Sequence, residues 1–248
     1  MFPPPPPPLL AVQDEVRAAF GWSLDDDQRS AQALSDRMGS PEPYGVPHWS
    51  FAAREAHLER LALACRTASR VVVVGAAATV EEVTAASGPA TVFIAADGAA
   101  GAVPEGLPLL AVVSDLDGGA HLHAAVKRGP VVVLHAHGDN RSTWEQHLAT
   151  WADVDTPPPL VLTHQGPDQV DGMHNPGGFT DGDRAVCLLR WMGVPKQALA
   201  FVGFALDKVG PWSGVTDPAR KVQKLTWMAE VLRRLGVMHE ALPQDEHS

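Results

Sequence analysis

Six short apolar runs, separated by stretches of helical periodicity, constrain the fold of this chain more than any other feature of its sequence. The runs are Val71–Val74, Thr91–Ala96, Leu109–Val113, Val131–Leu134, Leu160–Leu162 and Ala198–Phe204. They are bounded by glycine and proline and are apolar on successive residues, which is typical of strands buried on both faces of a parallel sheet. The helical stretches cover residues 120–127, 142–151, 183–191 and 218–235. This alternation predicts an α/β fold with a doubly wound, mostly parallel sheet of about six strands.

The first seventy residues lack this alternating pattern and contain no recognisable catalytic or binding motif. Six prolines, Pro3–Pro8, predict a short polyproline II segment. After them, helices are predicted over about 12–38 and 50–68. The resulting division is a proline-rich disordered tail at 1–10, an N-terminal helical segment at 11–69, an α/β catalytic domain at 70–240 and a C-terminal tail at 241–248.

Charge and hydropathy exclude several classes of partner. Nineteen lysines and arginines stand against 29 aspartates and glutamates, which gives a formal net charge of −10. This balance argues against binding nucleic acid through a broad basic face, and no apolar run approaches the ~20 residues of a membrane helix. The N-terminus lacks the basic and apolar regions of a signal peptide, and Cys65 and Cys187 fall in apolar helical patterns. We therefore expect a cytoplasmic protein with two buried free thiols that binds neither nucleic acid nor membranes.

Polar residues follow four successive predicted strands at the point where each strand ends. These segments are Asp97-Gly98, Ser114-Asp115-Leu116-Asp117-Gly118, His135-Ala136-His137-Gly138-Asp139-Asn140 and Thr163-His164-Gln165. One such ending is ordinary, because aspartate and asparagine favour turns. In open α/β sheets, however, ligands bind beyond the carboxyl ends of the strands. Four polar endings in a row therefore predict a functional site at that edge of the sheet.

Asp115 and Asp117 are candidates for a metal site. Because they are two residues apart, an extended backbone would project them to the same side, where two carboxylates repel each other unless a cation lies between them. Oxygen ligands of this kind suit Mg²⁺, which usually borrows phosphate oxygens from its substrate. The alternative is a solvated Asp-Gly turn, which we would favour for this short motif taken alone.

His135 and His137 alternate in the same way, with Asp139 next on that face. Such a set can ligate zinc or another transition metal, or the histidines can form a hydrogen-bonded pair in a polar crevice. Carboxylates are plentiful nearby and cysteine ligands are absent. We therefore interpret the histidines as phosphate or substrate contacts and Asp139 as an additional magnesium ligand.

A glycine-rich segment before the predicted helix 183–191 is a further candidate. Gly177 and Gly178 permit close approach of the backbone to a ligand. Thr180 precedes the helix as in a capping box, so the free amides of the helix start, together with Arg184, can bind phosphate. The alternative is simply a loop and a well-capped helix.

Two weaker candidates for phosphate contacts lie outside these segments. Lys221 and Lys224 share one face of the last predicted helix, where solvated lysines are also common. The turn Gly75–Thr79 follows the first apolar run and can cradle a phosphate. It matches neither a Walker A loop nor the dinucleotide-binding fingerprint.

Together, these motifs resemble those of the archaeal-type 6-hydroxymethyl-7,8-dihydropterin diphosphokinase family. The resemblance is carried by the four strand-end segments and by Gly177-Gly178-Phe179-Thr180-Asp181-Gly182-Asp183-Arg184. It spans roughly two-thirds of the chain, from about Val71 to the last helix. The first two acidic segments also resemble those of thiamin diphosphokinases, a related fold. The alanine-rich turn Gly75–Thr79 departs from the family pattern, in which this turn usually contains glycine, proline or serine.

The resemblance implies a thiamin-diphosphokinase-like sheet and transfer of a diphosphoryl group from ATP to the hydroxymethyl group of a reduced pterin, with release of AMP. Such chemistry depends on positioning and charge neutralisation, commonly with Mg²⁺. The expected metal ligands are Asp115, Asp117 and Asp139, with Asp97 and Asp181 as further candidates. The expected phosphate contacts are His135, His137 and Arg184, and Asp183 is the candidate proton acceptor for the attacking hydroxyl. The expected nucleotide or pterin contacts are Asp97, Asn140, Thr163, Gln165, Gly177, Gly178, Phe179, Thr180, Lys221 and Lys224.

Three other functions remain open at this stage. A diphosphokinase of the same fold can act on thiamin or another alcohol. A metal-dependent hydrolase can use His135, His137 and Asp139 without ATP. A non-catalytic protein can bind a nucleotide or pterin without turnover. The sequence is also compatible with a homo-oligomer, and with a place in either folate or methanopterin biosynthesis.

Overall fold

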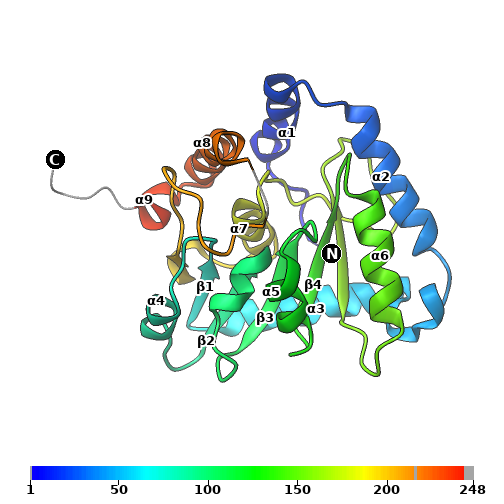
Figure 1. The fold of residues 1–248 in the computed structure, drawn as a ribbon, viewed down its shortest axis with the longest axis horizontal. Coiled ribbons are helices and arrows are strands. Elements are labelled where there is room, and N and C mark those ends of the chain that lie inside the picture. The colour runs from blue at the N-terminus through cyan, green and yellow to red at the C-terminus, as the bar shows by residue number, and fades with distance from the viewer. Residues whose placement is uncertain (1, 215–216, 243–248) are drawn as a thin grey trace, which may run out of the picture.

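The computed structural model describes residues 2–214 and 217–242 and contains one six-stranded sheet in which every strand pair is parallel. The order across the sheet is β5-β4-β3-β2-β1-β6 (Figure 1). The strands are β1 (Arg70–Val74), β2 (Thr91–Ala96), β3 (Leu109–Ser114), β4 (Val131–Ala136), β5 (Leu160–His164) and β6 (Leu199–Val202). The chain therefore runs outward from β1 to β5 and then returns to the other side of β1, which makes the carboxyl ends of β1 and β6 the topological switch point.

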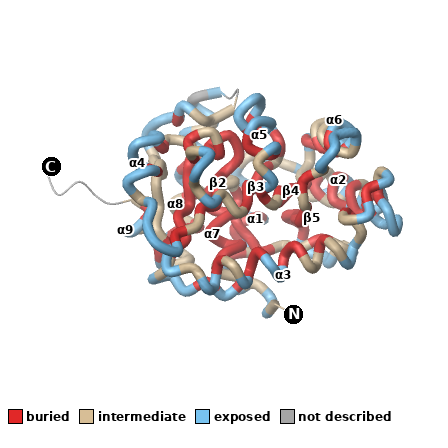
Figure 2. The backbone as a smooth tube through the Cα atoms, turned by 90° about the horizontal axis from the view of Figure 1, so that it is seen from below, coloured by how far each residue is buried: buried red, intermediate tan, exposed pale blue. Residues whose placement is uncertain are grey.

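Helices cover both faces of the sheet (Figures 1 and 2). One face carries α2 (Leu24–Arg37), α4 (Val80–Ala85), α5 (Gly119–Val126) and α6 (Arg141–Ala152). The other face carries α3 (Phe51–Thr67), α7 (Asp181–Trp191), α8 (Pro218–Leu235) and α9 (Met238–Ala241). Outside them, α1 (Pro7–Phe20) packs on α7 and α8. Short 3₁₀ turns occur at Pro43–Gly45, Pro47–Trp49, Asp97–Ala102 and Lys196–Ala198.

Alternate residues of the strands enter the two hydrophobic cores. Val72 and Val74 of β1 face the core that includes α2, whereas Val71 and Val73 face the core formed with α3 and α7. All four valines are fully buried, and the strands lie between two layers of helices in Figure 2. Burial on both sides explains the continuous apolar runs and confirms the predicted α/β fold.

The observed elements differ from the predicted ones mainly at their ends. Strands β4 and β5 continue to Ala136 and His164, so His135 and Thr163 lie within strands rather than after them. The helix predicted over 12–38 is two helices, because Gly21 adopts a left-handed conformation (φ 68°) and ends α1. Helices α4 and α9 were not predicted, since each spans fewer than two full turns.

The N-terminus differs from the predicted disordered tail over residues 1–10. Helix α1 already begins at Pro7. Proline is tolerated in the first turn of a helix, because the amide N–H that it lacks would have no hydrogen-bond partner there. Leu9 is buried against Phe179 and Val231. Ahead of the helix, the Trp191 indole N–H donates to the Pro3 carbonyl over 2.7 Å. The predicted C-terminal tail at 241–248 lies largely outside the described residues.

Two further predictions concern thiols and membranes. Cys65 and Cys187 are both free and fully buried, and burial raises the pKa of the Cys65 thiol to about 12. This confirms the expectation of buried free thiols. Over residues 2–214 and 217–242, none of the helices has the length and hydropathy needed to cross a membrane.

Candidate active site

A pocket of about 680 Å³ lies at the carboxyl edge of the sheet. Every strand end contributes to its wall: Ala76 after β1, Asp97 after β2, Asp115 after β3, His137 after β4, Gln165 after β5 and Phe204 after β6. Helix α7, helix α8 and the link between α1 and α2 close its remaining sides. The four polar strand endings therefore meet in one place, as the sequence predicted.

Three carboxylates form the acidic centre of this pocket. Asp97, Asp115 and Asp117 each place an oxygen within 4.8 Å of the other two, and this is the one such group of three among the described residues. The Oδ1 atom of Asp115 is buried and has no hydrogen-bond partner. A buried carboxylate oxygen without a donor, aimed into a group of carboxylates, fits a hard divalent cation such as Mg²⁺.

The backbone reaches this arrangement by a route that differs from the predicted one. Strand β3 ends at Ser114, and Leu116 adopts a left-handed conformation (φ 76°), so Asp115 and Asp117 do not alternate along an extended strand. The Ser114 hydroxyl accepts from the Leu116 amide over 2.8 Å and donates to Asp97. Gly118 admits the Asp97 carboxylate, because a Cβ at Gly118 would lie 2.5 Å from its Oδ2. A tight turn thus joins the three carboxylates.

Crowding raises the pKa of most of these acids. Burial and the nearby charge of Asp181 raise the pKa of Asp97 well above its ordinary value. Loss of hydration in the pocket and the charge of Asp115 raise the pKa of Asp117, and the same two causes raise the pKa of Asp181 to about 7. Concentrated negative charge that the protein alone does not neutralise is what a cation site requires.

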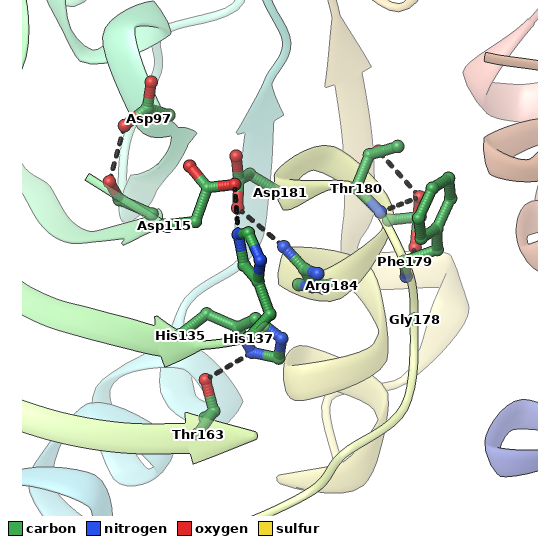
Figure 3. A network of polar contacts seen from close by, with 12 residues as sticks. Asp97, Asp115, His135, His137, Thr163, Gly178, Phe179, Thr180, Asp181 and Arg184 are labelled. Atoms are coloured by element: carbon green, nitrogen blue, oxygen red, sulfur yellow. Dashed lines mark hydrogen bonds and ion pairs between the residues drawn. The ribbon is translucent and has the colours of Figure 1, made fainter. Parts of the chain in front are cut away.

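His137 is the cationic neighbour of this acidic centre (Figure 3). Its Nε2 lies 3.1 Å from Asp115 and its Nδ1 lies 3.0 Å from Asp139. Burial opposes protonation of His137, but these two carboxylates outweigh it and raise the pKa of the imidazole to about 9. Burial likewise opposes ionisation of Asp115, yet His137 lowers the pKa of that carboxyl below its ordinary value. The two residues form an ion pair at neutral pH.

Asp139 departs from its predicted role as a third metal ligand. Its side chain is 93% exposed and pairs with His137 rather than joining Asp115 and Asp117. Its place in the carboxylate group is taken by Asp97, which the sequence offered only as a further candidate. The reason is that the turn after β4 places Asp139 at Nδ1 of His137, whereas Asp115 contacts Nε2 of the same ring.

His135 and Thr163 lie beneath the pocket rather than in it. His135 is 2% exposed, with Nδ1 3.0 Å from the Thr163 hydroxyl and Nε2 3.3 Å from Gln165 Oε1. Burial lowers the pKa of His135 well below its ordinary value, so the imidazole is neutral. The geometry therefore does not support the predicted phosphate contact by His135. It equally disfavours a metal-dependent hydrolase centred on His135, His137 and Asp139, because the two imidazoles do not converge.

Asn140 lines the pocket, but its side-chain amide is hydrogen-bonded to the protein backbone. Its side chain donates to the carbonyls of His135 over 2.7 Å and Asp115 over 3.1 Å, and accepts from the amide of His137 over 3.0 Å. Asn140 thereby clamps the ends of β3 and β4 together. It positions the Asp115–His137 pair, and a direct nucleotide or pterin contact stays a prediction.

The segment before α7 divides into residues that face the pocket and residues that support it. Asp181 and Arg184 line the pocket and pair with each other over 3.2 Å. Asp183 is fully buried and accepts from the Thr180 hydroxyl over 2.7 Å, the Thr180 amide over 2.9 Å and the Phe179 amide. It is the capping residue of α7, so the geometry does not support its predicted role as proton acceptor.

Gly177 and Gly178 allow neighbouring segments to pack closely; they do not bring the backbone close to a ligand. A Cβ at Gly177 (φ 91°) would lie 2.9 Å from Leu9 of α1, and one at Gly178 (φ 90°) would lie 2.9 Å from the Cα of Arg184. Neither glycine lines the pocket. They permit α1 and the start of α7 to pack closely, and so place Phe179 in the pocket wall.

An aromatic and cationic wall faces the acidic centre. Trp22, which follows α1, stacks on Phe20 at 4.7 Å and lies 6.0 Å from Phe179. Lys224 Nζ lies 5.6 Å from the Trp22 ring and 5.9 Å from the Phe179 ring, and Arg220 lies 5.3 Å above Trp22. We call Trp22, Phe179, Arg220 and Lys224 the aromatic wall. Sequence reasoning missed Trp22 and Arg220, since no motif marks either residue.

Backbone amides of the turn Gly75–Thr79 already have hydrogen-bond partners within the protein. The amide of Gly75 donates to Val202 over 2.8 Å, that of Ala77 to Gly203 over 2.9 Å, and that of Ala78 to Gly75 over 3.1 Å. The Trp212 indole N–H in turn donates to the Ala78 carbonyl over 2.7 Å. The turn therefore holds the segment after β6 against the pocket rather than cradling a phosphate with these amides.

The chain is similar to proteins from three archaea, each named a 6-hydroxymethyl-7,8-dihydropterin pyrophosphokinase; pyrophosphokinase and diphosphokinase are synonyms. The protein of Pyrococcus furiosus is 32% identical over 224 residues, which are 87% of each chain. That of Methanothermobacter thermautotrophicus is 40% identical over 119 residues, 47% of each chain. That of Methanocaldococcus jannaschii is 33% identical over 120 residues, 46% of this chain and 47% of the relative.

No protein-family model matches the chain. The similarity to the Pyrococcus protein nevertheless extends over nearly the whole length of both chains, well beyond the motifs at the strand ends. The resemblance predicted from those motifs is thereby confirmed. The chain belongs to the family of 6-hydroxymethyl-7,8-dihydropterin pyrophosphokinases.

Proposed function

We propose that this protein transfers a diphosphoryl group from ATP to the hydroxymethyl group of 6-hydroxymethyl-7,8-dihydropterin and releases AMP, as a step of pterin biosynthesis. Membership of the family supports the acceptor. The observation that carries the proposal is one pocket in which three carboxylates, Asp97, Asp115 and Asp117, face the cations Arg184 and Lys224. Anionic phosphates and a divalent cation together satisfy both sets of charges.

Asp97, Asp115 and Asp117 would hold Mg²⁺, with Asp181 beside them. A cation held there would supply positive charge that neutralises the phosphate oxygens of the substrate. The orphaned Oδ1 of Asp115 and the raised pKa of Asp97 support this ligand set, because the first is a buried oxygen without a donor and the second reflects negative charge that the protein does not neutralise. Protonated His137 fixes the second oxygen of Asp115 at 3.1 Å, which keeps Oδ1 directed at the cation.

The cations on the opposite side would bind the phosphate chain. Arg184, Lys221 and Lys224 line the pocket from α7 and α8. Burial lowers the pKa of Lys224, and the charge of Asp115 opposes this effect. A partly desolvated ammonium gains more from a phosphate than one in bulk water. Because transfer of this kind places little covalent demand on the protein, positioning between these cations and the carboxylates is the main catalytic contribution.

Release of AMP provides the decisive test. The purified protein is incubated with ATP, Mg²⁺ and 6-hydroxymethyl-7,8-dihydropterin, beside matched reactions with thiamin and without an acceptor. We expect AMP in proportion to the pterin consumed, and none above background in the other two reactions. AMP formed only with thiamin would mean that thiamin, and not the pterin, is the acceptor. AMP formed without any acceptor would mean that the protein hydrolyses ATP instead of transferring the diphosphoryl group.

ATP as donor is consistent with a cytoplasmic reaction, which we propose with the activity. A homo-oligomer stays a prediction that light scattering can check.

A further inference from the structure

A chain of buried polar groups connects the N-terminal helices to the pocket. Asp27 of α2 accepts from three separate segments: Arg17 of α1 over 3.0 Å, the Gly138 amide after β4 over 2.9 Å, and the Gln165 side chain after β5 over 2.9 Å. Gln165 in turn accepts from Arg184 over 2.9 Å. Arg17, Asp27, Gln165 and Arg184 are each only 5–6% exposed.

The chemistry of the two end groups determines which way Gln165 must face. The Asp27 carboxylate, paired with Arg17, only accepts hydrogen bonds, and the Arg184 guanidinium only donates them. A glutamine between them has to turn its NH₂ to Asp27 and its carbonyl to Arg184. The opposite orientation would set a donor against Arg184 and an acceptor against Asp27, with both groups buried.

We infer that Asp27 is a positioning residue for Arg184, acting through the side-chain amide of Gln165. Arg184 donates once to Gln165 and once, over 3.2 Å, to Asp181, while its Nε is buried without a partner. The Gln165 carbonyl is therefore one of the two contacts that hold the guanidinium against the pocket. The N-terminal helices, which carry no recognisable motif, thus complete the phosphate side of the site.

The same carboxylate also holds the turn that carries His137. Its Oδ1 accepts from Gly138, the residue after His137. Gly138 leaves room for this contact, because a Cβ there would lie 3.0 Å from Asp26 and 3.4 Å from Asp27 Oδ1. Asp27 therefore restrains both cationic groups, His137 and Arg184, from one position outside the acidic centre.

Asp27→Asn tests the orientation directly. Asp27 Oδ2 accepts from both Arg17 and Gln165 and Oδ1 accepts from Gly138, so the new amide sets its NH₂ against the Gly138 N–H in one orientation and against Arg17 and Gln165 in the other. Either the turn that carries His137 or the Gln165 link to Arg184 therefore loses its restraint. We expect affinity for ATP·Mg²⁺, measured by calorimetry, to fall about tenfold, with the KM for the pterin unchanged.

The double variant Asp27→Asn/Gln165→Glu fixes the new amide with its NH₂ toward residue 165 and keeps the net charge of the wild type, so that only the contact with Arg17 remains opposed. The introduced carboxylate accepts from the new amide on one side and from Arg184 on the other. We expect ATP affinity to recover to within about threefold of the wild type. The matched control is Asp14→Asn, which removes the other carboxylate partner of Arg17 but has no hydrogen bond to Gln165. It should leave ATP affinity unchanged.

Thermal unfolding of the same four proteins and of the single variant Gln165→Glu separates this inference from the proposed function on which its ligand rests. A rescue by Gln165→Glu in melting temperature, of several degrees relative to the sum of the single variants, shows the coupling without any ligand. If wild-type protein does not bind ATP, the proposed function fails, and the thermal cycle alone decides the inference. Additive melting temperatures, or unchanged ATP affinity in Asp27→Asn, would overturn it. Should Asp27→Asn not fold, Gln165→Met removes the same link, and wild-type ATP affinity in that variant would overturn the inference equally.

Discussion

The acidic centre and the aromatic wall face each other across one pocket but are built in opposite ways. Asp97, Asp115 and Asp117 come from neighbouring strands β2 and β3 within 21 residues of sequence, and a tight turn brings them together. Trp22 and Lys224 of the aromatic wall come from opposite ends of the chain and meet only because α1 packs on α8. The acidic centre concentrates negative charge that nearby cations do not fully balance. In the aromatic wall, by contrast, the cationic side chains lie against the aromatic rings.

From this difference we propose that catalysis resides in the acidic centre and recognition in the aromatic wall. Carboxylates with raised pKa values cost free energy in the folded protein unless a cation binds to them, so their presence together favours a cation site. Aromatic rings that hold cations at 5.3–5.9 Å stabilise the wall even without a ligand. We therefore expect changes in the acidic centre to abolish turnover, and changes in the aromatic wall to weaken binding by smaller factors.

The largest effect is expected from Asp115→Ala and Asp117→Ala. Either change removes a metal-facing carboxylate and should lower kcat at least about 10³-fold in the AMP-release assay. Circular dichroism should show a folded protein in each case. Asp139→Ala is the informative comparison, because that side chain is 93% exposed and outside the carboxylate group; we expect a loss below about tenfold. Full activity in both of the first two variants would refute the metal assignment.

A smaller effect is expected from Lys224→Met, which keeps the length of the side chain and removes its charge. Loss of one charged contact to phosphate should raise the KM for ATP about 10- to 100-fold and leave the KM for the pterin unchanged. Lys127, at the end of α5 and remote from the pocket, provides the matched control Lys127→Met. A rise in the pterin KM alone would place the phosphates elsewhere.

Trp22→Leu should have a smaller effect still. The side chain remains apolar, but the cation–π contacts of Arg220 and Lys224 are lost, worth about 0.5–1 kcal/mol each at exposed sites. We expect the KM for ATP to rise about two- to fivefold and kcat to change little. A loss of kcat as large as that of Asp115→Ala would remove the distinction between the two regions.

The smallest expected effect is the dependence of stability on pH in metal-free protein. Because the folded pKa of His137 is raised to about 9, the ion pair with Asp115 stabilises the protein fully below the unfolded pKa of about 6.5. That contribution is lost as the pH rises through about 9. The check is an NMR titration of the imidazole in EDTA, with melting temperatures over pH 6–10. A midpoint near 6.5 would contradict the ion pair, and Asp115→Ala should lower the raised pKa of His137, leaving the part that Asp139 contributes.

Much of the fold and part of the site follow from local sequence. Val71–Val74 reads as a strand because both its faces are buried, and the polar residues after β2 to β5 share an edge because every strand in the sheet is parallel. Asp115, Asp117 and His137 were predicted correctly to lie at that edge, for that reason. His135 was also assigned there, but it lies in β4 and packs beneath the pocket, since the strand extends further than its apolar run.

The sequence by itself determined the α/β class, the parallel strands and the edge at which the acidic residues gather, because these depend on period and on residues close in the chain. Only the tertiary structure decided that Asp97 rather than Asp139 completes the carboxylate group and that Trp22 and Asp27 line the pocket. Those contacts join segments up to about 200 residues apart. Their geometry depends on how helices pack on the sheet, and no local pattern encodes that packing.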